Sequence, residues 1–161
     1  MTDKAFQDYY TDDFSHCYGC GKHNSQGLQL KSYWEGDQSI ALYTPKPYHT
    51  AIPGFVYGGL IASLIDCHST GTAAAATYRE QNRPMDSEPA LRFVTASLQV
   101  DYLAPTPLDA QLEIRAEVEE ITPKKVVIKT RIIAKGKVCA KGRVIAVQMP
   151  KTMLNAVTGE K

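Results

Sequence analysis

Residues 58–78 read GGLIASLIDCHSTGTAAAATY, and this stretch decides the fold. From Leu60 onward, apolar and small residues recur at steps of three and four, which predicts a helix of about five turns. Asp66 is the only ionised residue in the stretch. A helix on a protein surface has a charged face. We therefore expect the rest of the chain to enclose this helix on most sides.

Strand patterns lie on both sides of the helix. Before it, the alternation over 28–33 and the segment 39–43 predict a hairpin that turns at Gly36-Asp37. After it, further strands are predicted over 97–102, 111–119, 126–134 and 138–148. Closely spaced strands with short turns are typical of an antiparallel meander. The sequence thus predicts an α+β hotdog fold, with one long central helix wrapped by a curved antiparallel sheet.

Length and charge narrow the functional classes. The chain has 161 residues, which fits one domain, and a formal net charge of +1, which gives no basic surface for nucleic acid. No stretch is long and apolar enough for a membrane span, and the first 13 residues lack the pattern of a signal peptide. We expect a soluble cytoplasmic protein with an irregular N-terminal arm (1–26), a hotdog domain (27–149) and a C-terminal tail (150–161).

The cysteines fall into two groups. Cys67 and Cys139 stand alone in apolar surroundings, where cysteine usually behaves as a small hydrophobe. The arm carries a short run of potential metal ligands: His16, Cys17, Cys20 and His23. Structural zinc needs four ligands, commonly two separate pairs, and the sequence offers no second pair. A reduced thiol pair in a turn is favoured over half of a zinc site, so no metal site is predicted.

Gly58 and Gly59 stand at the expected start of the helix. The first N–H groups of a helix have no acceptor within it, and the positive end of the helix dipole lies there. Bare glycines at this place suit a carbonyl oxygen that becomes an oxyanion. The alternative is that the glycines only allow a tight turn.

Asp66 is the second candidate. A lone carboxylate in an uncharged helix is costly to bury unless it is paired or functional. It is either catalytic or a structural residue bonded to a hydroxyl such as Thr70. Gly58 and Asp66 are eight residues apart, which is about 12 Å along one helix, whereas groups acting on one carbonyl must lie within about 3–3.5 Å of it. We therefore expect two antiparallel helices, one from each subunit of a dimer, to share two sites.

Two stretches resemble one family. Tyr57-Gly58-Gly59, followed by Leu64-Ile65-Asp66, resembles the His-Gly-Gly…Asp signature of hotdog-fold acyl-CoA thioesterases, in the branch similar to phenylacetyl-CoA thioesterase within the 4-hydroxybenzoyl-CoA thioesterase superfamily. Residues 93–105, FVTASLQVDYLAP, resemble the strand that follows in those proteins. Residues 17–21, CYGCG, resemble a lead-in of one subgroup, where it is not generally a metal site. The resemblance spans about residues 16–148 in the same order.

The resemblance implies roles by position. Gly58 would donate its N–H to the thioester carbonyl, and Asp66 of the partner subunit would act as nucleophile or as general base for water. Thr95 would help to place that water or the carboxylate. The positions implied in substrate binding are Tyr57, Gly59, Ser97, Tyr102, Lys124, Lys125 and His49. Of these, Ser97 and Tyr102 would lie along the pantetheine path, and the two lysines would meet the coenzyme A phosphates. No cofactor is implied beyond the coenzyme A of the substrate, and the partner is a second copy, as a homodimer or homotetramer.

The sequence departs from the family in two places. Tyr57 replaces the usual histidine, and Ala51 stands where several members carry Asn or Gln, with His49 as a nearby polar substitute. The alternatives are a surface-loop histidine for His49, a solvated turn for the two lysines, and a core or interface residue for His68.

The predicted function is hydrolysis of an acyl-CoA thioester to a free acid and coenzyme A. The alternative is a non-catalytic hotdog protein that binds acyl-CoA, which the two departures would fit. A hydratase is disfavoured because no Asp-x-x-x-x-His pair stands before the helix.

Overall fold

The computed structural model describes residues 3–160. Its longer elements are β1 (Ser32–Glu35), β2 (Gln38–Tyr43), α1 (Gly58–Glu80), β3 (Phe93–Tyr102), β4 (Leu112–Ile121), β5 (Lys125–Ala134), β6 (Lys137–Gln148) and α2 (Lys151–Thr158). Three short 3-10 helices are η1 (Phe6–Tyr9), η2 (Asp12–Phe14) and η3 (Pro47–His49). All six strands form one antiparallel sheet in the order β1-β2-β4-β5-β6-β3. This arrangement confirms the predicted α+β hotdog fold.

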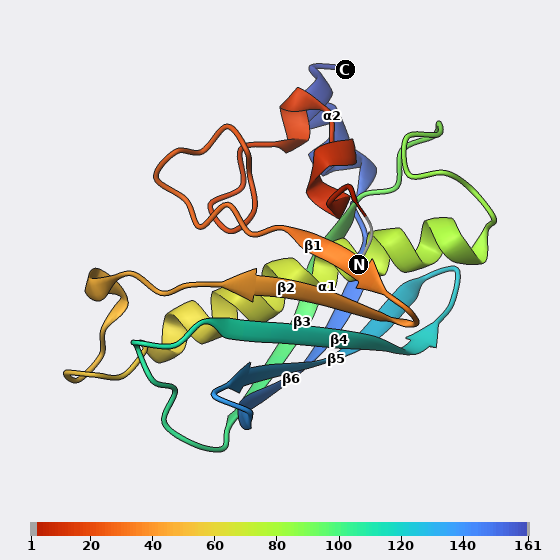
Figure 1. Ribbon diagram of the computed structural model, residues 1–161. Coiled ribbons are helices and arrows are strands. Elements are labelled where there is room, and N and C mark those ends of the chain that lie inside the picture. The colour runs from red at the N-terminus through yellow and green to blue at the C-terminus, as the bar shows by residue number, and fades with distance from the viewer. Residues whose placement is uncertain (1–2, 161) are drawn as a thin grey trace.

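The central helix lies across one face of the sheet (Figure 1) and contacts β3, β4, β5 and β6. Leu64 and Ile65 are completely buried there. The sheet approaches the helix so closely that a Cβ at Gly142 of β6 would lie 2.4 Å from Ile65 Cγ2. The enclosure inferred from the missing charged face is therefore confirmed.

Two predictions about strands are wrong. The first strand begins at Ser32 and not at residue 28, because Gln29 has a φ of 51°, which breaks the extended conformation. Leu28 and Leu30 are buried as the alternation indicated, but their N–H groups bond to carbonyls of the arm at Tyr18 and Gly19. In addition, β3 does not precede β4 in a meander: it pairs with β6 at the edge of the sheet.

The edge strand β3 is the least covered strand. Leu98 is 39% exposed and Tyr102 is 55% exposed, so the apolar alternation of this strand is not buried within one chain. The second edge of β3 pairs with no other strand in the described part of the chain. A long unpaired edge with exposed apolar side chains is suited to pairing with another chain.

The two ends of the chain are more ordered than expected. In the arm, Phe6 and Gln7 are buried, and Gln7 Nε2 donates to Ser32 Oγ over 3.1 Å. The expected C-terminal tail contains α2, with Gly159 at its C-terminal cap. The division into arm, domain and tail stays a prediction. Among the described helices, none combines the length and the apolar character that crossing a membrane requires.

Candidate active site

The N-terminus of α1 leaves two backbone donors free. Tyr57 caps the helix in an extended conformation, and its carbonyl accepts the N–H groups of Leu60 and Ile61 at 3.1 and 3.4 Å. Within residues 3–160, the N–H groups of Gly58 and Gly59 have no acceptor. They are the donors that an oxyanion at this helix end would meet.

The two glycines are explained by close contacts rather than by a turn, since neither has a positive φ. A Cβ at Gly59 would lie 2.3 Å from the Tyr57 ring, and one at Gly58 would lie 3.3 Å from Tyr102 Oη. The Tyr102 hydroxyl donates to the Gly58 carbonyl over 2.7 Å. The expected substrate residues Tyr57, Gly59 and Tyr102 therefore surround the helix start.

His49 lies at the same end of the molecule. A cavity of about 410 Å³ is lined by His49, Tyr57 and Gly59 together with Tyr48 and Ser63. The His49 carbonyl accepts the N–H of Tyr57, and its Nδ1 accepts the N–H of Lys46 at 3.0 Å. Burial, and then the positive charge of Lys46, lower the pKa of His49 below its usual value. His49 is therefore placed beside the glycine pair as a neutral group at pH 7.

Asp66 is held by the strand that crosses its helix. The Thr95 hydroxyl donates to Asp66 Oδ1, and a bulge follows Thr95 in the pairing of β3 with β6. Bulges often redirect side chains next to active sites. The suggested partner Thr70 donates instead to the main-chain carbonyls of Asp66 and Cys67, so a structural role for Asp66 would depend on Thr95. The structure thus pairs Asp66 with the hydroxyl expected from the family resemblance.

One chain does not bring the glycine pair and Asp66 together. Both belong to α1, eight residues apart, so about 12 Å of helix separates them. In one chain the candidate residues therefore form two separate groups, here called half-sites: Gly58 with Tyr102, and Asp66 with Thr95.

Ser97 and the two lysines lie away from the glycine pair. Ser97 is exposed on β3. Lys124 is exposed in the β4–β5 turn, and Lys125 Nζ lies 3.4 Å from Glu120. In the sheet register, Lys125 pairs with Val147 of β6, which also pairs with Val94 of β3. Lys125 therefore lies two strand spacings, about 10 Å, from Val94, the residue before Thr95. This is the end of β3 at which Thr95 contacts Asp66.

His68 is a core residue, which confirms one of the two predicted alternatives. It is completely buried, with Nδ1 at 2.9 Å from Ser32 Oγ and Nε2 at 3.1 Å from Ser39 Oγ. Burial lowers the pKa of His68 to about 4. It is neutral at pH 7 and links α1 to the first hairpin.

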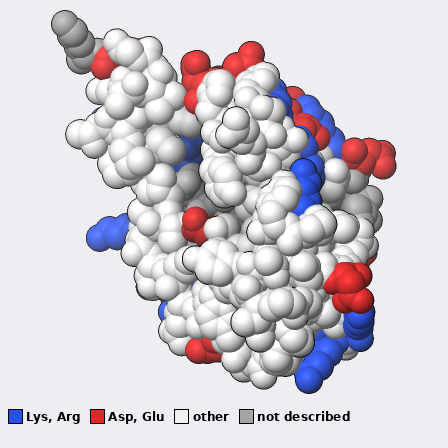
Figure 2. Space-filling view, turned by 90° about the vertical axis from the view of Figure 1, so that its left-hand side faces the viewer, with Lys and Arg blue, Asp and Glu red and all other residues white. Residues whose placement is uncertain are grey.

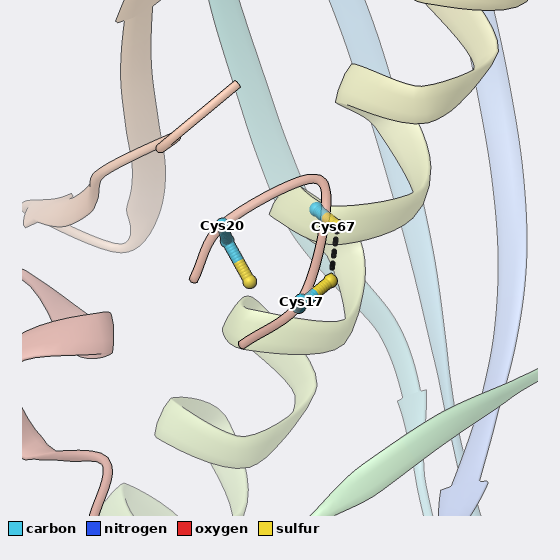
Figure 3. Close-up of side chains that lie close together, drawn as sticks. All are labelled: Cys17, Cys20 and Cys67. Carbon is cyan, nitrogen blue, oxygen red and sulfur yellow. Dashed lines mark hydrogen bonds between the residues drawn. The ribbon is translucent and has the colours of Figure 1, made fainter. Parts of the chain in front are cut away.

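The prediction that Cys67 and Cys139 stand alone in apolar surroundings is wrong for Cys67. Cys139 is buried in an apolar cluster as predicted, but Cys67 does not stand alone. Its sulfur lies with those of Cys17 and Cys20, and all three are within 4.8 Å of one another (Figure 3). This cluster was not predictable from the sequence, because residues 47 and 50 positions apart meet only when the arm crosses α1.

Comparisons with known proteins agree on one family. The model of the thioesterase superfamily matches residues 53–141. A crystal structure of a thioesterase superfamily protein from Shewanella loihica PV-4 is 50% identical, covers 88% of this chain and 100% of its own, and has a TM-score of 0.67. A Streptococcus mutans protein solved with acetyl CoA is 17% identical, covers 74% of this chain and 88% of its own at a TM-score of 0.61, and supports the fold alone.

A curated relative is acyl-coenzyme A thioesterase THEM4 from Xenopus laevis. It is 37% identical over 87 residues, which is 54% of this chain. The chain spans about a third of the length of that relative, 33%.

Proposed function

Because the chain belongs to the thioesterase superfamily, we propose that it hydrolyses an acyl-CoA thioester to a free acid and coenzyme A. The observation that carries the proposal is that Asp66, which accepts a hydrogen bond from Thr95 of β3, lies on the same helix that presents two free N–H groups at its start. The activity named for the curated relative agrees with this substrate class.

Each half-site has a chemical task. The Gly58 N–H, at the positive end of the helix dipole, stabilises the negative charge that forms on the thioester oxygen. Asp66 acts on the carbonyl carbon, either by attacking it or by taking a proton from the attacking water. The C–S bond then breaks, and the sulfur of coenzyme A takes up a proton that comes from the water. If Asp66 attacks directly, the water enters in a second step and hydrolyses the anhydride between the acyl group and Asp66, which releases the free acid. The Thr95 hydroxyl fixes the carboxylate oxygen that it contacts, so that the second oxygen faces the reacting atoms.

A second copy of the chain would complete the site. Thr95 and Tyr102 mark the two half-sites on β3, and the midpoint between them falls at Gln99 once the extra residue of the bulge after Thr95 is left out of the count. If two β3 edges pair antiparallel about this midpoint, Tyr102 of one chain lies opposite Thr95 of the other. Gly58 then approaches the partner's Asp66. The exposed Leu98 and Tyr102 support burial at such an interface.

The surface at the start of α1 fits an acyl chain or a subunit contact. Figure 2 shows this end of the molecule, and most of it is uncharged. The exposed large apolar side chains from its segments include Tyr48, Ile52, Phe55 and Leu103. Lys124 and Lys125 are proposed to meet the coenzyme A phosphates at the Asp66 end, where a phosphate would compete with Glu120 for Lys125.

A panel of acyl-CoAs tests the function directly. We expect free thiol to appear with at least one aliphatic or aromatic acyl-CoA, measured with a thiol reagent against a blank without protein. Saturable acyl-CoA binding with no thiol release across the panel would contradict hydrolysis and support the non-catalytic binding protein. Hydration of crotonyl-CoA without thiol release would indicate a hydratase.

A further inference from the structure

Three cysteine sulfurs meet where the N-terminal arm crosses α1, and the proposed hydrolysis uses none of them. Cys67 comes from the helix, and Cys17 and Cys20 come from the loop that lies over it (Figure 3). The sulfurs of Cys17 and Cys67 are 3.7 Å apart, and all three sulfurs lie within 4.8 Å of one another. Two thiolates on one tetrahedral zinc ion, each about 2.3 Å from it, are about 3.8 Å apart. The Cys17–Cys67 spacing therefore fits one shared ion, and the Cys20 sulfur, which lies within 4.8 Å of the other two, would have to move by at most about 1 Å to join it.

The loop is shaped to bring its sulfurs to the helix. A Cβ at Gly19 would lie 2.1 Å from Cys67 Sγ, and one at Gly21 would lie 2.5 Å from the main-chain nitrogen of Cys17. Gly21 N–H bonds to the Cys17 carbonyl at 2.8 Å, which closes the turn between the two cysteines. Glycine at both positions is thus a requirement of this close approach.

The chemistry of the donors indicates which ion would fit. All three candidate ligand atoms are cysteine sulfurs, and a metal ion binds cysteine as the thiolate. Thiolate donors select soft or borderline ions such as zinc.

We propose that Cys17, Cys20 and Cys67 bind one Zn²⁺ ion through their three sulfurs. The three cysteines line a cavity of about 310 Å³, which His16 and Asp13 also line. A tetrahedral ion with three thiolates keeps one position for water or for the His16 imidazole. The objection from ligand number is reduced to one missing ligand, because Cys67 supplies a third sulfur beside the two of the arm.

The ion would join the arm to the helix beside the reacting carboxylate. Cys67 directly follows Asp66 in α1, and the cavity extends to Phe93 and Val94, next to Thr95. Zinc at this place cross-links residues 17–20 to the helical turn that carries Asp66. Its role is to position and stabilise this turn, and it takes no part in the thioester chemistry.

Metal binding by the reduced full-length protein tests the proposal, and it needs no activity measurement. We expect the protein to retain about one equivalent of zinc after dialysis, and Co²⁺ in its place to give the intense near-ultraviolet absorption of sulfur-to-cobalt charge transfer. Cys67→Ala is expected to weaken zinc binding by on the order of 100-fold or more, since losses of 10–100-fold follow even from changes outside the ligand set. Cys139→Ala is the matched control, because Cys139 is buried away from the cluster, and it should bind zinc as the wild type does.

Two results would overturn the proposal. One is a reduced wild-type protein that gives no thiolate–cobalt absorption and retains no zinc. The other is equal zinc affinity in Cys67→Ala and wild type. The proposal is also overturned if the reduced protein binds no zinc and a mild oxidant joins Cys17 to Cys67 in a disulfide. The cobalt spectrum of the wild type keeps the test decisive if Cys67→Ala does not fold.

Discussion

Replacing Asp66 by Asn is expected to lower kcat/KM for thioester hydrolysis by about 10³-fold, within the range for loss of a general base. Asparagine can neither attack the carbonyl carbon nor take a proton from water. Its amide oxygen can still accept the hydrogen bond from Thr95, so the fold is expected to survive. The measurement is thiol release from the best acyl-CoA of the panel, with the melting temperature recorded for each variant.

Asp86→Asn is the matched control for this change. Asp86 is exposed in the loop between α1 and β3, and its loss of charge should leave kcat/KM unchanged. Wild-type kcat/KM in Asp66→Asn would show that this carboxylate does not carry the reaction, even if hydrolysis itself is confirmed.

Gly58→Pro is expected to lower kcat/KM by about 10²–10³-fold, the loss typical of one oxyanion donor. Proline removes the N–H and is well tolerated at the first position of a helix, which Gly58 occupies. Tyr57 has φ −60° and ψ 131°, a conformation that suits the residue before proline. The change therefore deletes a donor while the helix start is preserved, and kcat and KM are to be measured separately.

Gly58→Ala separates the effect of losing the N–H donor from the effect of the added side-chain bulk. Alanine adds a Cβ at the same place, 3.3 Å from the Tyr102 hydroxyl, but keeps the N–H. Its loss of kcat/KM should be much smaller than that of proline. Equal losses in the two variants would mean that crowding against Tyr102 explains the effect and that the Gly58 N–H is not the donor.

The fold was largely predictable because its signals are local. The uncharged helix, the charged alternation of β4 and the short turns each depend on residues close together in the chain. The position of β3 was not predictable in this way, since pairing with β6 and not with β4 is decided between distant strands. The late start of β1 depends on one left-handed residue, Gln29, which is not a glycine and carries no turn signal.

The candidate site was likewise predictable where its signals are local and not where it depends on contacts between distant residues. Asp66 and the glycine pair stood out as local anomalies of one helix, and the family resemblance supplied Thr95. The sulfur cluster did not stand out, because Cys67 looks like a small apolar helix residue until the arm is laid over it. The exposed edge of β3 is visible only once the strand order is known.

Mixing the two inactive variants tests the shared site most directly. In a heterodimer of Asp66→Asn with Gly58→Pro, one site combines an intact Gly58 with the partner's intact Asp66, and the second site is defective at both places. Random pairing of equal amounts puts half of the dimers in this form, so about a quarter of the wild-type specific activity should return. Subunits carrying different tags show whether heterodimers have formed. Recovery to about a quarter is the predicted result, and heterodimers that remain as inactive as the separate variants would contradict the account.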